Sequence, residues 1–169
     1  DVLLGPEMLS TGEVMGLSDD FGTAYAKSQV ASGNTLPAGG SVLFSVNDKD
    51  KPKAVHLARR LRDLGFKIVA TKGTCIEFIR HNIPSEFVLK INEGRPHIVD
   101  AIINRQIALI VNTTVGKESI VDSFSIRRSA VDHQVPYVTT IRGAEAVVKA
   151  IEALKTRKMR VKPIQSYYK

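Results

Sequence analysis

From Gly40 onward, short apolar runs alternate with longer amphipathic segments, and no other feature constrains the fold as strongly. The run from Ser41 to Val46 has the composition of a buried strand. The segment from Pro52 to Leu64 repeats apolar residues at helical spacing, and Gly65 behind it can end a helix. This strand-then-helix pattern then repeats along the chain.

The full pattern predicts five strands and five helices in alternation. We expect strands at 41–46, 66–70, 86–89, 107–111 and 137–139. We expect helices at 52–64, 74–81, 97–106, 119–134 and 144–156. Strands that alternate with helices of this length form parallel sheets covered on both faces, with right-handed crossovers. The sequence therefore predicts an α/β fold with a five-stranded parallel doubly wound sheet, a Rossmann-like three-layer arrangement.

Residues 1–39 differ from the rest of the chain. They contain five glycines before Gly39 and two prolines, and only residues 18–32 have the features of a helix. Ser18 can cap that helix and Gly33 can end it. Because so short a stretch cannot bury a core of its own, we interpret 1–39 as a connector from a preceding domain. The sheet domain then covers 40–156.

The net charge of +7 comes almost entirely from the end of the chain. Six of the 24 Lys and Arg residues, and none of the 17 acids, lie between Lys155 and Lys169. The remaining 18 bases and 17 acids nearly balance, so no basic face for nucleic acid is predicted. We expect the basic tail 157–169 to be solvated and mobile; a contact with another domain or chain is the alternative.

Several classes of protein are excluded by what the sequence lacks. Cys75 is the only cysteine, which excludes an internal disulfide and thiolate zinc sites. His56, His81 and His133 have no partner at metal-binding spacing, so no metal site is expected. No apolar run approaches the roughly 18 residues of a membrane span, and no signal-peptide pattern opens the chain. We therefore expect a cytoplasmic protein that binds no membrane.

Candidate binding residues follow the expected strands, because ligands of doubly wound sheets bind at the carboxyl ends of the strands. After the second strand comes Thr71-Lys72-Gly73-Thr74, whose hydroxyls and free amides suit a phosphate. Gly73 would let the backbone approach such a ligand closely. The alternative is that Thr71 or Thr74 only caps the next helix.

Other loops at this edge add charge and polarity. Lys51 stands at the start of a helix and opposes its dipole, at a cost of roughly 0.3 to 1 kcal/mol that a bound anion would offset. Lys90 ends the third strand, and Asn112 and Thr114 follow the fourth. Lys51 could equally be solvated, but the agreement of separate loops predicts an anion site.

The roles of two arginines and of the cysteine are less clearly indicated by the sequence. Arg127 and Arg128 could hold an anion or face solvent, and we interpret Cys75 as a small buried residue. No Walker loop and no G-x-G-x-x-G follows a strand, so ATP hydrolysis and dinucleotide binding are not expected.

These residues resemble the large subunit of carbamoyl-phosphate synthase. Glu-Met-Leu-Ser-Thr-Gly-Glu-Val-Met-Gly at 7–16 is similar to the exit segment of its second ATP-grasp half. Glu-Gly-Arg-Pro-His-Ile at 93–98, Asn-Thr-Thr at 112–114 and Ile-Arg-Arg-Ser-Ala at 126–130 resemble its bacterial carboxyl-terminal regulatory domain. The resemblance runs in order to about Arg157 and implies a methylglyoxal synthase-like fold, which agrees with the predicted sheet.

The resemblance implies a domain that does no chemistry and binds nucleotide monophosphates, UMP as inhibitor and IMP as activator. It would tune carbamoyl phosphate synthesis for the pyrimidine and arginine pathways. The implied phosphate contacts are Lys51, Thr71, Thr74 and Lys90, and the loop pattern itself adds Gly73. The implied further nucleotide contacts are Asn112, Thr114 and Ser123. Tyr137 and Thr139 would form part of an ornithine site that the preceding domain completes.

The parent enzyme implied by the resemblance is a glutamine-hydrolysing ligase that uses ATP with Mg or Mn and K. Its preceding ATP-grasp domains and its small glutaminase subunit are the implied partners, and no cofactor is implied for this domain. Lys72 and Val115 depart from the family pattern, where histidine and a small polar residue are common. These departures bear on effector preference.

Two alternative functions remain. Methylglyoxal synthase and the IMP cyclohydrolase domain use similar phosphate loops, so an enzyme of this shape is the first alternative. Methylglyoxal synthase needs an aspartate as base after the third strand, and Glu93 is the only carboxylate between Ile91 and Val99. A basic RNA-binding fragment is the second, and the absence of tryptophan disfavours it.

Overall fold

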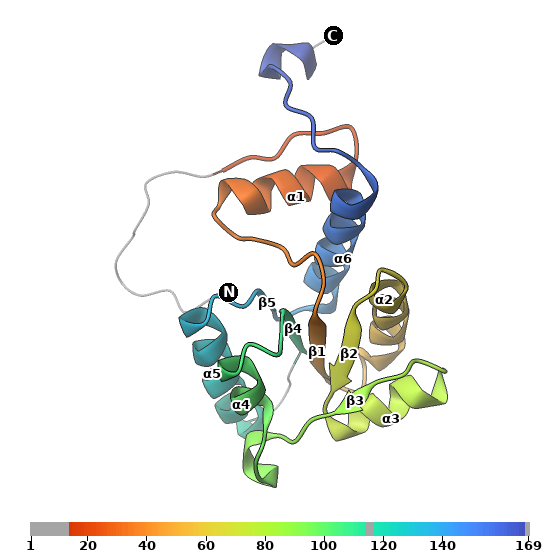
Figure 1. The fold of residues 1–169 in the computed structure, drawn as a ribbon, viewed down its shortest axis with the longest axis vertical. Helices are drawn as coiled ribbons and strands as arrows, with labels where there is room; N and C mark the ends of the chain where they lie inside the picture. Colours follow the sequence, from red (N-terminus) through yellow and green to blue (C-terminus); the bar gives the residue numbers. More distant parts are fainter. Residues whose placement is uncertain (1–13, 114–116, 168–169) are drawn as a thin grey trace.

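A five-stranded parallel sheet forms the centre of the computed structural model, which describes residues 14–113 and 117–167. Its strand order is β3-β2-β1-β4-β5, and every neighbouring pair is parallel (Figure 1). The strands are Ser41–Val46 (β1), Lys67–Ala70 (β2), Glu86–Phe87 (β3), Leu109–Thr113 (β4) and Tyr137–Val138 (β5). The predicted doubly wound α/β sheet is confirmed.

Helices cover both faces of this sheet (Figure 1). One face carries α2 (Lys51–Asp63), α3 (Lys72–Arg80) and α6 (Ile141–Thr156). The other carries α4 (Ile98–Ile103) and α5 (Lys117–Asp132). The three-layer arrangement leaves the ends of the strands open, and the loops there are free to bind a ligand.

The apolar run of β1 is buried because it lies at the centre of the sheet. Val42 and Phe44 pack into the core on the α2 side, and Leu43 between them packs into the core on the α4 side. All three are 0% exposed. Side chains of a strand alternate between faces, so a strand covered on both faces needs a continuous apolar run. Burial of each such side chain contributes about 1.5 to 3 kcal/mol.

Three strands end at residues other than those predicted: β5 ends at Val138 rather than 139, and the ends of β4 and β3 also differ. β4 continues to Thr113 rather than ending at 111, because Asn112 pairs with Ser45 of β1 and Thr113 with Val46. Asn112 is therefore a buried strand residue and not a loop residue. β3 ends at Phe87 rather than 89, because its only strand neighbour, β2, ends where Ala70 pairs with Phe87.

Helix boundaries differ more than strand boundaries. α3 begins at Lys72 rather than 74, which places Gly73 and Thr74 in its first turn and Thr71 at its N-cap position. α2, α5 and α6 also begin before their predicted starts, and α4 is shorter than predicted. For α6 the reason is Thr140, whose hydroxyl oxygen accepts a hydrogen bond from the Gly143 N–H at 3.0 Å.

The single predicted helix of the connector is present as α1 (Phe21–Ala31). Its cap is Asp20 and not Ser18, because the Asp20 carboxylate accepts the Thr23 N–H at 2.9 Å. α1 packs against α6 (Figure 1). A side chain at Gly22 would place its Cβ 2.5 Å from the Lys149 carbonyl oxygen, so the two helices approach backbone to backbone. α1 is thus packed onto the sheet domain, and the division into a connector at 1–39 and a domain at 40–156 stays a prediction.

The basic tail lies beside the start of α1. Arg157 is 3.3 Å from the Asp20 carboxylate, and Lys162 is 3.7 Å from that of Asp19. The Tyr167 hydroxyl, in the short 3-10 helix η2 (Ile164–Tyr167), donates to the Leu17 carbonyl at 3.3 Å. The ion pairs are exposed and contribute little each. Mobility of the tail stays a prediction.

Candidate functional site

The strand order reverses between β1 and β4. The chain leaves β1 towards β2 and β3 at one edge and then returns to β4 and β5 at the other (Figure 1). At such a switch point the loops diverge and leave a crevice at the carboxyl ends of the two strands, where doubly wound proteins bind their ligands. The loop before α2 and the first turn of α3 both lie beside the end of β1.

Lys51 and Gly73 meet in this region. Lys51 is the first residue of α2, and its side chain is 20% exposed. A Cβ built on Gly73 would lie 3.3 Å from the Lys51 Nζ, so the ammonium occupies the space that a side chain at position 73 would enter, at the start of α3. Two residues predicted from separate loops are therefore neighbours.

The two threonines of the loop are buried beside this pair. Thr71 is 4% exposed and Thr74 is 1% exposed. The Thr74 hydroxyl oxygen accepts the Val46 N–H at 3.4 Å, which joins the end of β1 to the first turn of α3. Thr71 occupies the N-cap position, but its side chain makes no capping hydrogen bond. The capping alternative thus agrees with the position of Thr71, although the Thr71 hydroxyl makes no capping hydrogen bond, and Thr74 lies inside α3.

The Lys51 ammonium is paired with an exposed carboxylate. Its Nζ lies 2.7 Å from Asp48 Oδ1, and the Asp48 side chain is 92% exposed. This hydrogen bond, together with the positive charge of Lys51, lowers the pKa of the Asp48 carboxyl. A cation, free amides at a helix start and a replaceable carboxylate form an arrangement that can bind a phosphate.

A second group of predicted residues lies at the end of β4. The Asn112 Nδ2 donates to the Tyr137 hydroxyl at 2.6 Å and to Ser123 Oγ at 3.2 Å. Asn112 is 2% exposed, and its Oδ1 has no hydrogen-bond partner in the described part of the chain. Burial raises the pKa of Tyr137, although the bond from Asn112 works in the other direction. The structure thus joins Asn112, Ser123 and Tyr137 into one polar cluster.

Comparison with known proteins identifies the fold. A family model described as an MGS-like domain matches residues 53–139, about half of the chain. The chain belongs to this family. The carbamoyl phosphate synthase large chain of Myxococcus xanthus is 53% identical over 167 residues, which cover 99% of this chain and 15% of that protein. The large chain of Archaeoglobus fulgidus is 51% identical over 169 residues and is covered to 16%. The predicted resemblance is confirmed.

This MGS-like domain spans about 15% of the length of those relatives.

The structure does not bring all of the predicted site residues together. Lys90 is exposed after β3, and among the described residues no hydrogen bond or ion pair joins its side chain to either group. Thr139, half-buried, follows β5. Thr114 lies outside the residues that the structure describes. The predicted site is therefore assembled in part.

The two arginines that the sequence left open have different places. The Arg127 guanidinium carbon lies 5.6 Å from the centre of the Tyr137 ring. Its Nε is buried and has no partner among residues 14–113 and 117–167. Arg128 is 69% exposed and faces Asp132 at 4.0 Å. Arg127 thus belongs to the Asn112 cluster, and only packing across α5 and β5 could reveal this.

Asn47 was not predicted as a candidate residue, but it lies between the loop before α2 and the end of β4. Its side chain contacts Asp50 and Thr113, at the ends of the loop and of β4. An asparagine directly after a strand, with an aspartate three residues on, is a signal of an Asx turn at a helix start. That signal was available in the sequence.

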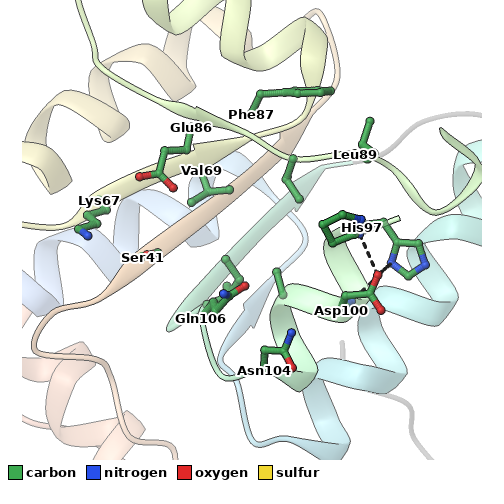
Figure 2. A pocket seen from close by; sticks show the side chains of 14 residues that line it. Ser41, Lys67, Val69, Glu86, Phe87, Leu89, His97, Asp100, Asn104 and Gln106 are labelled. Carbon is green, nitrogen blue, oxygen red and sulfur yellow. Dashed lines mark hydrogen bonds and ion pairs between the residues drawn. The ribbon is translucent and has the colours of Figure 1, made fainter. Parts of the chain in front are cut away.

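A cavity of about 710 Å³ lies elsewhere, on the part of the sheet face beside α4 (Figure 2). None of the predicted site residues that the structure describes lines it. On its wall the Asp100 carboxylate is bonded to the Arg95 guanidinium and accepts the His97 N–H at 2.9 Å. These contacts, the Arg95 bond first, lower the pKa of Asp100 to about 2. The ion pair between Arg95 and Asp100 thus lies at the first turn of α4.

The described part of the chain also bears on the sequence expectations for metal ions, for Cys75 and for membrane-spanning helices. No group of three or more His, Cys, Asp or Glu residues there could hold a metal ion. Cys75 is 5% exposed, with its Sγ 3.2 Å from Ser85 Oγ, which agrees with a small buried residue. None of the described helices is long and apolar enough to cross a membrane.

Proposed function

We propose that this MGS-like domain is the regulatory domain of a carbamoyl phosphate synthase large chain. Its site binds nucleoside monophosphates, with UMP as inhibitor and IMP as activator. The observation that carries the proposal is the position of the Lys51 ammonium beside Gly73, 3.3 Å from where a Cβ would stand in the first turn of α3. The similarity over 99% of the chain to the large chains supports the same assignment.

The phosphate is the common part of both nucleotides, and it would lie at the start of α3. There it meets the Lys51 charge, the free amides of the first turn and the hydroxyls of Thr71 and Thr74. A charge-assisted hydrogen bond of this kind contributes about 1.5 to 3 kcal/mol. Lys90, exposed after β3, would supply a second positive charge to the phosphate.

The nucleoside would extend towards Asn112 in β4 and its hydrogen-bond partner Ser123 in α5, with Thr114 as a further contact. Tyr137 and Thr139 would contribute to ornithine binding, with the rest of that site in the preceding ATP-grasp domain. The parent ligase would use ATP with Mg or Mn and K, pair with a glutaminase subunit and act in the cytoplasm.

This domain would carry no catalytic step of its own. The Glu93 carboxylate accepts the Lys90 backbone N–H at 2.8 Å. Asp100, the next acid along the chain, has a pKa of about 2. A carboxylate with so low a pKa is a weak general base near neutral pH. These observations disfavour the methylglyoxal synthase alternative.

Calorimetric titration of the 169-residue chain with UMP and IMP tests the binding proposal. Lys51→Ala and Lys90→Ala should each weaken both nucleotides about tenfold or more, since 1.4 kcal/mol corresponds to tenfold. Lys53→Ala is the matched control, because Lys53 is an exposed lysine of the same helix as Lys51. Simultaneous binding of both nucleotides, or unchanged affinity in Lys51→Ala, would refute the site.

Two further experiments test the regulatory role. Deletion of this domain from a full large chain should leave synthase turnover and abolish the nucleotide response, because allosteric coupling needs the second site. Full UMP inhibition after deletion would contradict the assignment. Release of methylglyoxal from dihydroxyacetone phosphate by the 169-residue chain, absent in Lys90→Ala, would favour the enzyme alternative.

A further inference from the structure

Asn47 uses its whole side chain to connect two parts of the site. Its Nδ2 donates to the Thr113 carbonyl and to Asp50 Oδ2, both at 2.7 Å. Its Oδ1 accepts the Asp50 N–H at 3.0 Å. Its backbone N–H also donates to the Thr113 carbonyl, at 3.1 Å. Asn47 therefore joins the end of β4 to the residue that precedes Lys51.

These bonds determine where α2 begins. Asp50 stands at the N-cap position of α2, but its own side chain makes no capping hydrogen bond. Asn47 instead holds Asp50 from both sides, through the backbone N–H and through the carboxylate. Because Lys51 follows directly, the position of its ammonium against Gly73 depends on this turn.

The other end of the connection lies on β4. Thr113 is the last residue of β4, is 4% exposed and follows Asn112, the centre of the second polar cluster. The connection therefore crosses the switch point between β1 and β4. It joins the part of the site with Lys51 to the part with Asn112.

We propose that Asn47 is a positioning residue that holds Lys51 in place for a phosphate ligand, an inference that rests on the proposed function. Without the side chain, the loop before α2 must be ordered when the ligand binds, and that ordering weakens binding. The pairing of β1 with β4 does not depend on this side chain, because Val46 pairs with Thr113 and the Asn47 N–H still reaches the Thr113 carbonyl. Asn47→Ala should therefore fold.

A double-mutant cycle on the 169-residue chain tests the inference, with UMP and inorganic phosphate as titrants. Asn47→Ala should weaken both about tenfold, close to the effect of Lys51→Ala. Combined with Lys51→Ala, it should weaken binding no further than about twofold, because residues that act through one contact are not additive. Asn34→Ala, which changes an exposed asparagine outside the site, is the control and should leave both affinities unchanged.

Asn47→Asp is the second variant, in case the alanine variant fails to fold. It keeps the oxygen that accepts the Asp50 N–H but cannot donate to the Thr113 carbonyl, so it should bind phosphate at least tenfold more weakly. Wild-type affinity in either Asn47 variant, or effects of Asn47→Ala and Lys51→Ala that multiply, would overturn the inference alone. Unchanged affinity in Lys51→Ala would instead overturn the proposed function.

Discussion

Gly73→Ala separates ligand binding from stability in this site. Gly73 is exposed in the first turn of α3, and apart from its chain neighbours and the backbone of its own helix, the only described atom within 4 Å of an added Cβ is the Lys51 Nζ, at 3.3 Å. The flexible Lys51 side chain can move by the few tenths of an ångström that a methyl group needs. The variant should therefore fold, with its new methyl group in the space between the ammonium and the helix start.

The two expected effects have opposite signs. Alanine stabilises a helix relative to glycine by roughly 0.5 to 1 kcal/mol, which for a chain of this size raises the melting temperature by about 1 to 4 °C. A phosphate at the same place would lose a charge-assisted hydrogen bond of about 1.5 to 3 kcal/mol. That loss corresponds to a decrease in affinity of about 10- to 100-fold.

Thermal unfolding and calorimetric titration with UMP measure the two effects on the same protein. Gly39→Ala is the control, because an added Cβ there meets no described atom within 4 Å and Gly39 lies outside the site. Wild-type affinity in Gly73→Ala would refute the placement of the phosphate. A lower melting temperature together with weaker binding would show that the methyl group disturbs the fold, and the reasoning would fail.

Three further predictions concern single contacts. Asp48→Asn removes the carboxylate that competes for Lys51, so UMP affinity measured by calorimetry should rise about two- to fivefold; weaker binding would contradict this. Tyr137→Phe leaves the Asn112 Nδ2 without its 2.6 Å acceptor, and the free energy of unfolding in urea should fall by about 1 to 2 kcal/mol. Because the pKa of Asp100 is lowered from 3.8 to about 2, its contribution to stability is present above about pH 4 and is lost as the pH falls towards 2. The melting temperature of Asp100→Asn should therefore fall less over that pH interval than that of the wild type. Parallel plots of melting temperature against pH for the two proteins would contradict a stabilising ion pair between Arg95 and Asp100.

The fold class could be predicted from the sequence because its signal is local. Val42, Leu43 and Phe44 form a continuous apolar run, and only a strand covered on both faces needs one. The boundaries could not be predicted as well, because they depend on neighbours. Asn112 became a strand residue because Ser45 of β1 pairs with it, and neither residue marks that pairing in its own segment.

The candidate site also has one part that the sequence predicts and one part that only the tertiary structure shows. The sequence alone placed Lys51, Thr71, Gly73 and Thr74 at the ends of strands, since residue type and position along the chain are enough for that. Only the tertiary structure decided that Lys51 lies against Gly73 and that Arg127 lies over a ring from β5. Such contacts join residues far apart in the chain, and their geometry follows from how helices pack on the sheet, which no local pattern encodes.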